Sequence, residues 1–232
     1  MSARKLAEKQ PASFAFNDDM LARAKRIIAK YPAGRQASAV IPLLDLAQRQ
    51  EGWVTQPAIE VVGKMLDMPA IRVLEVATFY TMFNLHPVGK AHVQVCTSLS
   101  CQLRGSDDVV RACKEKLGVG MGEVSADGKY SLGEVECAGA CVNAPVFQIG
   151  DDYYEDADYA NTSKVLDALK SGGALPKPGS LTGRDNAAPK GSPLTLVDDP
   201  TQPIPKQDFA AAKAAFEKAK AEAAAKAAAP KV

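Results

Sequence analysis

Four of the five cysteines in this 232-residue chain fall into two close pairs, and paired thiols can bind metals or exchange electrons. Cys96 and Cys101 follow the stretch HVQV as C-x4-C, and Cys137 and Cys141 follow GEVE as C-x3-C. A further 35 residues separate the two pairs. Each pair begins where a predicted strand gives way to a loop, so the four thiolates can meet at one edge of a sheet.

The spacing of these cysteines distinguishes between several kinds of site. A structural zinc ion also takes four thiolates, but its ligands usually lie in tighter C-x2-C turns. A [2Fe-2S] cluster takes two thiolates on each of two irons, which suits two separated and wider loops. A thioredoxin-like redox pair has the spacing C-x-x-C, which neither pair shows. The spacing favours the [2Fe-2S] cluster; zinc, redox thiols and cysteines buried as small apolar side chains remain alternatives.

Residues around the pairs suit a negatively charged cluster. A helix is predicted to start with Ser106 as its N-cap, so that its positive end points toward Cys101. Gly139, between the second pair, is expected to let the backbone approach the sulfur atoms. Arg104 either adds positive charge or is simply an exposed side chain.

The fifth cysteine and the two histidines are assigned other roles. Cys113 lies on the apolar stripe of the predicted helix together with Val110 and Leu117, so we expect a core residue. His86 and His92 resemble a Rieske pair, but four cysteines leave no cluster position for them. His92 alternates with inward-facing valines and is predicted to face solvent.

Composition argues against a nucleic-acid-binding, membrane-spanning or secreted protein. Net charge is +1 and hydrophobic residues make up 47% of the chain, which indicates a packed core and no nucleic-acid or anionic-membrane surface. No apolar run approaches the ~18 residues of a membrane span. The N-terminal stretch MSARKLAEKQPASF lacks the apolar region of a secretory signal. With an odd cysteine count, the sequence predicts a protein of a reducing compartment.

The predicted fold class is α+β, in three regions. Residues 17–85 are expected to form a helical domain, a small antiparallel bundle. Gly52 should end its second helix, and Thr55 and Pro57 should start its third. The predicted helices span residues 18–31, 38–51, 55–67 and 69–83.

Residues 90–172 change to a mixed pattern. A strand is predicted over 91–95 and a helix over 106–117, followed by two strands around the Asp127–Gly128 turn. A second hairpin should turn near Gly150, and a closing helix should end at Gly172. This order indicates a small α+β layer that resembles thioredoxin.

Residues 173–232 form the third region. Residues 173–206 are rich in Gly, Pro, Asp and Ser and are predicted to be a linker. Residues 207–229 are rich in alanine and lysine and favour a helix. Phe209 and Phe216 are its only large apolar residues, so this helix either frays in solvent or clamps a neighbouring subunit.

Four segments of the chain resemble those of one known family. The segments VCTSLSCQLRGSDDV and GEVECAGACVNAPVFQIGDDYYE, with VIPLLDLAQRQEGWV and VATFYTMFN, resemble the 24 kDa iron-sulfur subunits of proton-translocating NADH–quinone oxidoreductase, respiratory complex I. The resemblance covers residues 17–172. It implies a helical domain, a thioredoxin-like domain and one [2Fe-2S] cluster held by Cys96, Cys101, Cys137 and Cys141.

The same resemblance implies partners. In the family, a larger flavoprotein subunit binds FMN, NADH and a [4Fe-4S] cluster, and other peripheral-arm subunits complete the assembly at the cytoplasmic side of the bacterial inner membrane. The [2Fe-2S] cluster lies close to the FMN and holds one electron. This chain offers no catalytic residue of its own, and its stretch 118–122, GVGMG, lacks the dinucleotide fingerprint.

Two alternatives share the cluster motif. One is the equivalent diaphorase subunit of an NAD-reducing hydrogenase or a formate dehydrogenase. The other is a stand-alone thioredoxin-like ferredoxin, against which the helical N-terminal domain argues, because a diffusing carrier needs only the cluster domain.

Overall fold

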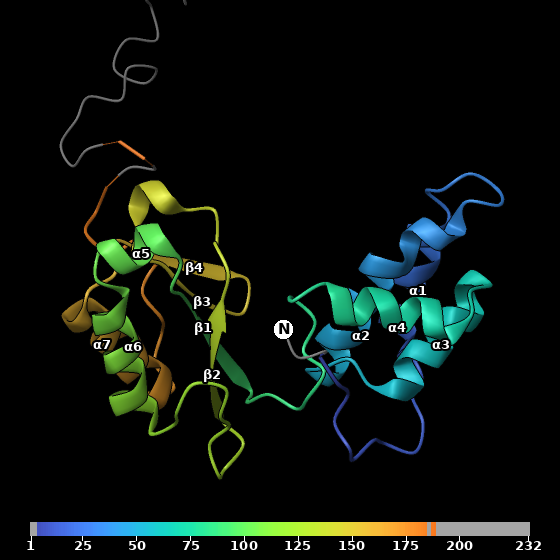
Figure 1. Cartoon of the computed structure of the whole chain (residues 1–232), viewed down its shortest axis with the longest axis horizontal. Helices are drawn as coiled ribbons and strands as arrows, with labels where there is room; N and C mark the ends of the chain where they lie inside the picture. Colours follow the sequence, from blue (N-terminus) through green and yellow to red (C-terminus); the bar gives the residue numbers. More distant parts are fainter. Residues whose placement is uncertain (1–3, 185–186, 189–232) are drawn as a thin grey trace, which may run out of the picture. The chain divides into compact units, whose positions relative to one another are not determined.

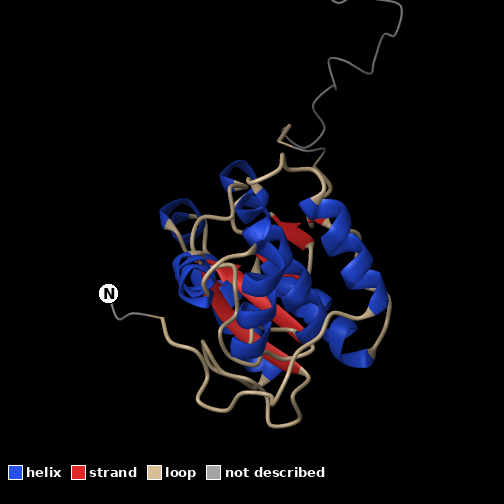
Figure 2. Cartoon of the chain, turned by 90° about the vertical axis from the view of Figure 1, so that its right-hand side faces the viewer, coloured by secondary structure: helices blue, strands red, loops and turns tan. Residues whose placement is uncertain are grey.

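The computed structural model describes residues 4–184 and 187–188, and the predicted tail helix over 207–229 lies outside them. Figure 1 shows the chain coloured from its N-terminus to its C-terminus, and Figure 2 shows helices in blue and strands in red. None of the helices within the described ranges is long and apolar enough to cross a membrane.

The first part of the chain is helical, as predicted (Figure 1). Its elements are α1 (Asp18–Ile28), the short 3-10 helix η1 (Gln36–Ala39), α2 (Val40–Glu51), α3 (Gln56–Leu66) and α4 (Ala70–Phe79). They share one hydrophobic core, whose largest buried members include Phe83, Leu43, Leu44, Val54 and Val62. The apolar faces that the sequence pattern predicts therefore meet in one shared core.

Local signals set most of the helix ends. The Thr55 hydroxyl accepts a hydrogen bond from the Ala58 N–H at 3.2 Å, which confirms the predicted start of α3. Gly52 has a φ of 83° and ends α2, also as predicted. The prediction that the fourth helix reaches residue 83 is wrong. The chain turns extended at Tyr80, and this turn carries Phe83 into the core, where it is completely buried.

The second part is a five-stranded mixed sheet with the order β2-β1-β3-β4-β5. Its strands are β1 (Ala91–Cys96), β2 (Tyr130–Val135), β3 (Phe147–Ile149), β4 (Asp152–Glu155) and β5 (Gly179–Ser180). β2 runs parallel to β1, β3 and β4 form an antiparallel hairpin beside β1, and β5 runs parallel to β4. The helices of this part are α5 (Leu99–Leu103), α6 (Ser106–Leu117) and α7 (Tyr159–Ser171).

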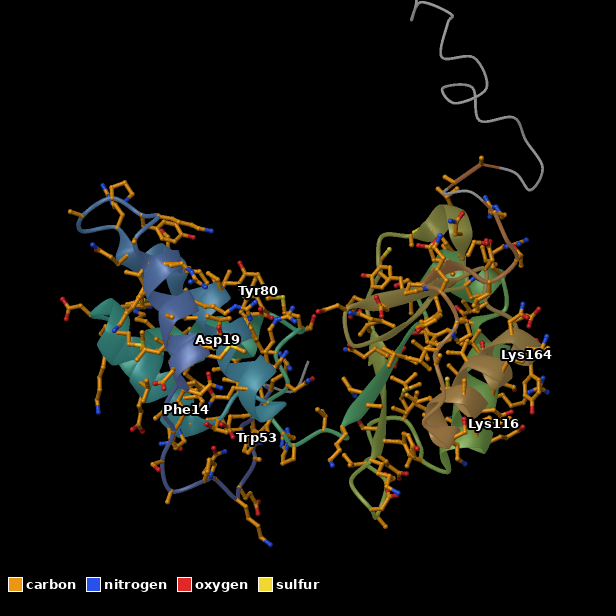
Figure 3. The ribbon with its side chains drawn as sticks, turned by 180° about the vertical axis from the view of Figure 1, so that it is seen from behind. Phe14, Asp19, Trp53, Tyr80, Lys116 and Lys164 are labelled. Carbon is orange, nitrogen blue, oxygen red and sulfur yellow. The ribbon has the colours of Figure 1, made fainter. Side chains whose placement is uncertain are left out.

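Helices α6 and α7 lie side by side and pack on the sheet (Figure 1). Val93 and Val95 of β1 are buried against them, and so is Cys113 of α6, which confirms its predicted core position. Lys116 of α6, labelled in Figure 3, also joins the two helices through an ion pair of 2.7 Å with Asp167 of α7. This packing holds β1 rigidly behind the first cysteine pair.

The structure departs from the predicted elements in three places. Only one strand forms around the Asp127–Gly128 turn, because residue 124 makes just a single bridge to Ser131. The cap of α6 is Gly105, with a φ of 100°, and Ser106 is its first helical residue. Helix α5 has no counterpart in the predicted elements, since five residues are too few to show a helical pattern.

The start of the predicted linker is part of the sheet. Gly179 and Ser180 form β5 beside Tyr154 and Glu155, within a stretch whose composition indicated a linker. The predicted hairpin turn at Gly150 and the end of the closing helix at Gly172 are confirmed. Composition alone therefore placed the end of the folded region too early.

Replacing Tyr154 by phenylalanine is expected to raise the free energy of unfolding by about 1 kcal/mol. The Tyr154 hydroxyl is buried without a hydrogen-bond partner among the described residues, while its ring stacks on Phe147 at 5.1 Å. The substitution keeps the ring and removes the unpaired polar group. Urea unfolding of the two proteins, with Tyr153→Phe as control, tests this; a destabilised Tyr154→Phe protein would contradict it.

Candidate metal centre

The first cysteine pair is buried at the end of the central strand. Cys96 is the last residue of β1 and Cys101 lies in α5, and each is only 2% exposed. They form a small apolar cluster with Ala144, covered by Val135 and Ala138. This pair is thus fixed by the core of the sheet.

The second pair lies at the surface. Cys137 and Cys141 are both exposed, and their sulfur atoms are 3.4 Å apart. Gly139 between them has a φ of 79°, which favours glycine, and a Cβ there would meet nothing within 4 Å. The turn alone therefore accounts for a glycine at this position.

Strand pairing brings the two loops together. Because β1 and β2 are parallel with Cys96 opposite Val135, the chain leaves both strands at the same edge of the sheet. The Cys96 sulfur accepts a hydrogen bond from the Ala138 N–H, and the Cys141 sulfur accepts one from the Ser100 hydroxyl. Each loop therefore contacts a sulfur atom of the other.

The thiols differ in acidity. Burial alone would raise the pKa of Cys96, but N–H groups of Ala138 and Ser98 and the thiol of Cys101 donate to its sulfur, and its pKa falls below the ordinary value. Burial, and then donation to Cys96, raises the pKa of Cys101 to about 11. The hydrogen bond to Cys137 raises the pKa of Cys141. The hydrogen bonds to its sulfur therefore favour the thiolate form of Cys96.

The donor set suits a cluster with two metal ions. Among the described residues, no group of three or more His, Cys, Asp or Glu side chains is close enough to hold a metal ion. The sulfur atoms form one buried pair and one exposed pair, and a [2Fe-2S] cluster takes two thiolates on each of its irons. The N–H groups that donate to sulfur come from Ser98 and Ala138. They do not come from the first turn of α6, which the sequence had suggested as the positive end near this pair.

His92 does not face solvent, contrary to prediction. Its Nδ1 lies 2.7 Å from the Ser131 hydroxyl, and burial lowers the pKa of the ring. The ring packs over β2 where residue 133 is glycine, because a Cβ there would come within 2.9 Å of the imidazole. The His92 ring is thus packed against β2. His92 lies four residues before Cys96 along the chain.

Two polar residues of the site escaped the sequence analysis. Ser98 and Ser100 donate to sulfur atoms, yet serines between two cysteines carry no pattern that identifies them as donors. The stretch 118–122 lies away from these donors in the chain. Its Gly118 ends α6, whereas a dinucleotide fingerprint joins a strand to the start of a helix.

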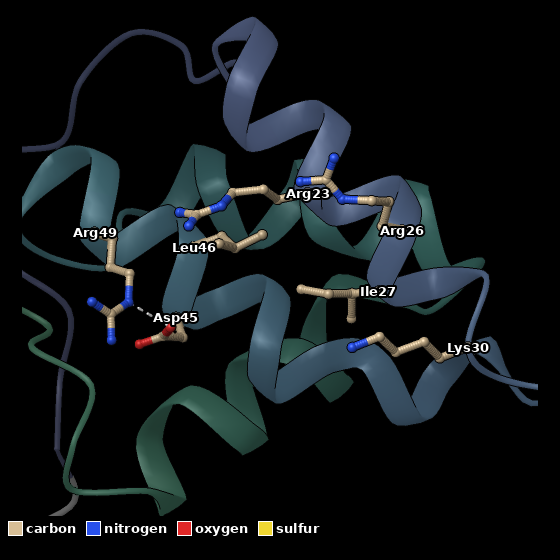
Figure 4. Close-up of a pocket in the computed structure, with 7 residues that line it drawn as sticks. All are labelled: Arg23, Arg26, Ile27, Lys30, Asp45, Leu46 and Arg49. Atoms are coloured by element: carbon tan, nitrogen blue, oxygen red, sulfur yellow. Dashed lines mark hydrogen bonds and ion pairs between the residues drawn. The ribbon is translucent and has the colours of Figure 1, made fainter.

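A separate groove lies between α1 and α2 in the helical part (Figure 4). It is lined by Arg23, Arg26, Ile27, Lys30, Asp45, Leu46 and Arg49. Asp45 accepts a hydrogen bond from Arg49 at 2.8 Å on the same helix. The groove contains none of the cysteines and adds a basic surface to the helical part.

Comparisons with known proteins point to one family. Residues 24–170 match the model of the family described as thioredoxin-like [2Fe-2S] ferredoxin. A Rickettsia bellii protein named as a subunit of NADH-quinone oxidoreductase is 58% identical over 160 residues, 68% of this chain and 96% of that protein. Its counterpart in Rickettsia conorii is 56% identical over 160 residues, with the same shares covered. Among solved structures, an air-oxidized NAD+-reducing [NiFe]-hydrogenase aligns over 56% of this chain and 23% of its own, at 17% identity and a TM-score of 0.49.

Proposed function

Because the chain belongs to the thioredoxin-like [2Fe-2S] ferredoxin family, we propose that it is the electron-transfer subunit of an NADH–quinone oxidoreductase, carrying one [2Fe-2S] cluster. One observation carries the proposal. The chain is 58% identical to a protein named as a subunit of NADH-quinone oxidoreductase and spans 96% of that protein. The hydrogenase and the ferredoxin among the solved structures share only 17% and 21% identity with this chain.

The proposed ligands are Cys96, Cys101, Cys137 and Cys141. When bound, the [2Fe-2S] cluster supplies a centre that takes up and returns one electron. The buried pair fixes one side of the site to β1 and α5, while the exposed pair leaves the other side at the surface. Such a site suits electron transfer to a docked partner.

The separate cores support a division of the chain into regions. We propose a helical domain over 17–85 and a thioredoxin-like domain over 90–172, since the main hydrophobic core of each part lies largely within its range. Residues 173–232 form the third region, whose first residues extend the sheet as β5. The proposed role of its tail helix as a clamp rests on sequence alone.

The surface around the cysteines supports docking of a partner. Leu99 and Leu103 lie one turn apart on α5 and are 70% and 78% exposed, and Val142, next to Cys141, is 67% exposed. Exposed apolar side chains that gather in one patch are typical of interaction sites, whereas single ones are common on any surface. We propose that these three residues, the apolar rim, contact the flavoprotein subunit that binds FMN and NADH.

The place of the chain in the cell follows from its partners. Within the complex it would be a peripheral subunit at the cytoplasmic side of the bacterial inner membrane, bound to the flavoprotein and to other subunits of the peripheral arm. NADH and FMN would bind the flavoprotein only. The reductant would therefore reach the cluster through that flavoprotein.

Adding NADH to the isolated protein is expected to leave the visible absorbance of the cluster unchanged. Adding the flavoprotein subunit should allow NADH to bleach it, because the electron then passes through FMN. Gel filtration of the mixture should show both subunits in one peak. Bleaching of the pure, flavin-free chain by NADH, or separate elution of the two subunits, would overturn the proposal.

Variants of the apolar rim test where the flavoprotein binds. The double change Leu99→Ser and Leu103→Ser should keep the cluster spectrum and slow its reduction through the flavoprotein at least about tenfold. Val124→Ser is the matched control, since Val124 is an exposed apolar residue outside the ligand-bearing segments. Equal reduction rates in parent and double variant would show that the partner docks elsewhere.

A further inference from the structure

The segment that follows α7 folds back onto the loop that carries the second cysteine pair. Gly179 and Ser180 pair with β4, and the Leu181 N–H donates to the Glu155 carbonyl at 2.9 Å. Leu175 and Leu181 pack against the core of the sheet. These residues lie beyond residue 170, where the match to the family ends. The segment is therefore part of the folded domain next to the metal centre.

Arg184, at the end of this segment, binds the backbone beside Cys141. One guanidinium nitrogen, Nη1, donates to the Asp156 carboxylate at 2.8 Å and to the Val142 carbonyl at 3.3 Å. Nε and Nη2 donate to the carbonyls of Ala188 and Ala187 at 3.0 and 3.1 Å. The guanidinium group is thus surrounded by acceptors, one of which belongs to the residue directly after a proposed ligand.

The ion pair at this point is the least exposed of those among the described residues. The side chains of Arg184 and Asp156 are 18% and 8% exposed, whereas every other pair has at least one partner exposed by more than half or both by more than a third. Asp156 also accepts a hydrogen bond from the Ser180 hydroxyl at 2.6 Å. Charge-assisted hydrogen bonds of low exposure hold geometry more firmly than surface pairs do.

Asp156 extends the contact to a second carbonyl of the ligand loop. Its N–H donates to the Asn143 carbonyl at 2.7 Å, so Arg184 and Asp156 bind the carbonyls of two successive residues after Cys141. Asp156 has a φ of 51°, in the left-handed region that aspartate tolerates better than most residues do.

We propose that Arg184 is a positioning residue for the metal centre, acting with Asp156 as a clamp on residues 142–143 that fixes the orientation of Cys141. The clamp rests on the proposed ligand role of Cys141. The guanidinium group also neutralises the Asp156 carboxylate beside the exposed half of the site. Since reduction adds negative charge to the cluster, an unpaired carboxylate there would disfavour the reduced form.

The test compares two variants. Arg184→Gln removes both the positive charge and the guanidinium group with its several hydrogen bonds, whereas Arg184→Lys keeps the charge. Arg111→Gln is the matched control, because Arg111 forms an exposed ion pair of 2.8 Å with Asp108 within α6. In the full-length, cluster-loaded protein, Arg184→Gln should release iron to a chelator about tenfold faster than the parent does. Its midpoint potential should fall and its electron paramagnetic resonance line should broaden. Arg184→Lys should restore the potential and leave the release partly accelerated, while Arg111→Gln should match the parent in all three.

A second measurement separates the clamp from the cluster assignment. In the cluster-free full-length chain, mass spectrometry of peptides should show Cys141 alkylated faster in Arg184→Gln than in the parent, with Cys101 unchanged. Parent-like potential, iron release and alkylation in Arg184→Gln, or equal changes in Arg111→Gln, would overturn the clamp. A parent protein that binds no iron would refute the proposed function, and the alkylation result would still decide the clamp.

Discussion

Replacing Cys96 or Cys137 by alanine is expected to abolish the [2Fe-2S] signal, whereas Cys113→Ala should keep it. Cys96 and Cys137 belong to different pairs, so each change leaves one iron with a single protein thiolate. Cys113 lies in the core between α6 and the sheet, and burial raises its pKa to about 12, which makes it a poor ligand. The measurements are electron paramagnetic resonance of the reduced proteins and counts of iron and acid-labile sulfide.

The same variants should differ in stability. Loss of the cluster removes ligand-binding free energy from the folded state, so both ligand variants should unfold at lower urea concentration than the loaded parent. Cys113→Ala should lower the free energy of unfolding by roughly 1 kcal/mol or somewhat more, as a small core truncation does. A Cys113→Ala protein without the cluster, or a Cys96→Ala protein that retains it, would refute the ligand assignment.

Replacing Phe147 by alanine should lower the free energy of unfolding by about 3–5 kcal/mol. Phe147 is buried in β3, pairs with Val95 of β1 and stacks on Tyr154 of β4. The residue before it accepts a hydrogen bond from the Cys96 N–H at 3.1 Å, so a cavity here also loosens the support of the first ligand. We therefore expect the variant to lose its cluster absorbance at a lower temperature than the parent.

Urea unfolding followed by circular dichroism measures this effect. Phe79→Ala is the matched control, because Phe79 is an exposed phenylalanine at the end of α4, and its replacement should change stability by no more than about 0.5 kcal/mol. If Phe147→Ala and Phe79→Ala unfold at the same urea concentration, the core around β1 and β3 contributes less than its burial indicates.

Features set by neighbouring residues could be predicted from the sequence. Thr55 caps α3 through its own side chain, and Gly52 and Gly172 end helices because each adopts a conformation that other residues avoid. The hairpin at Gly150 follows from the same local chemistry. Such signals depend on only a few neighbouring residues, so helix ends and turns can be predicted without knowledge of the fold.

Features set by distant residues could not be predicted. The burial of Phe83 ends α4 early, and the space over Gly133 accommodates the ring of His92. For the site, spacing identified the two cysteine pairs, but it gave no sign that one is buried and the other exposed. Arg184 lies 43 residues after Cys141, in a stretch whose composition indicates a linker, so the sequence does not link it to the site.

The ends of the sheet affect how the protein behaves at high concentration. An open edge strand presents unpaired backbone groups and invites pairing with another molecule, which leads to aggregation. At the β5 edge the strand has only two residues and turns away at once. At the β2 edge, Gly122 and Ser125 donate N–H groups to the carbonyls of Leu132 and Tyr130, so the segment before the Asp127–Gly128 turn covers the outer side of β2. Both borders therefore offer few unpaired backbone groups with which a second copy could pair.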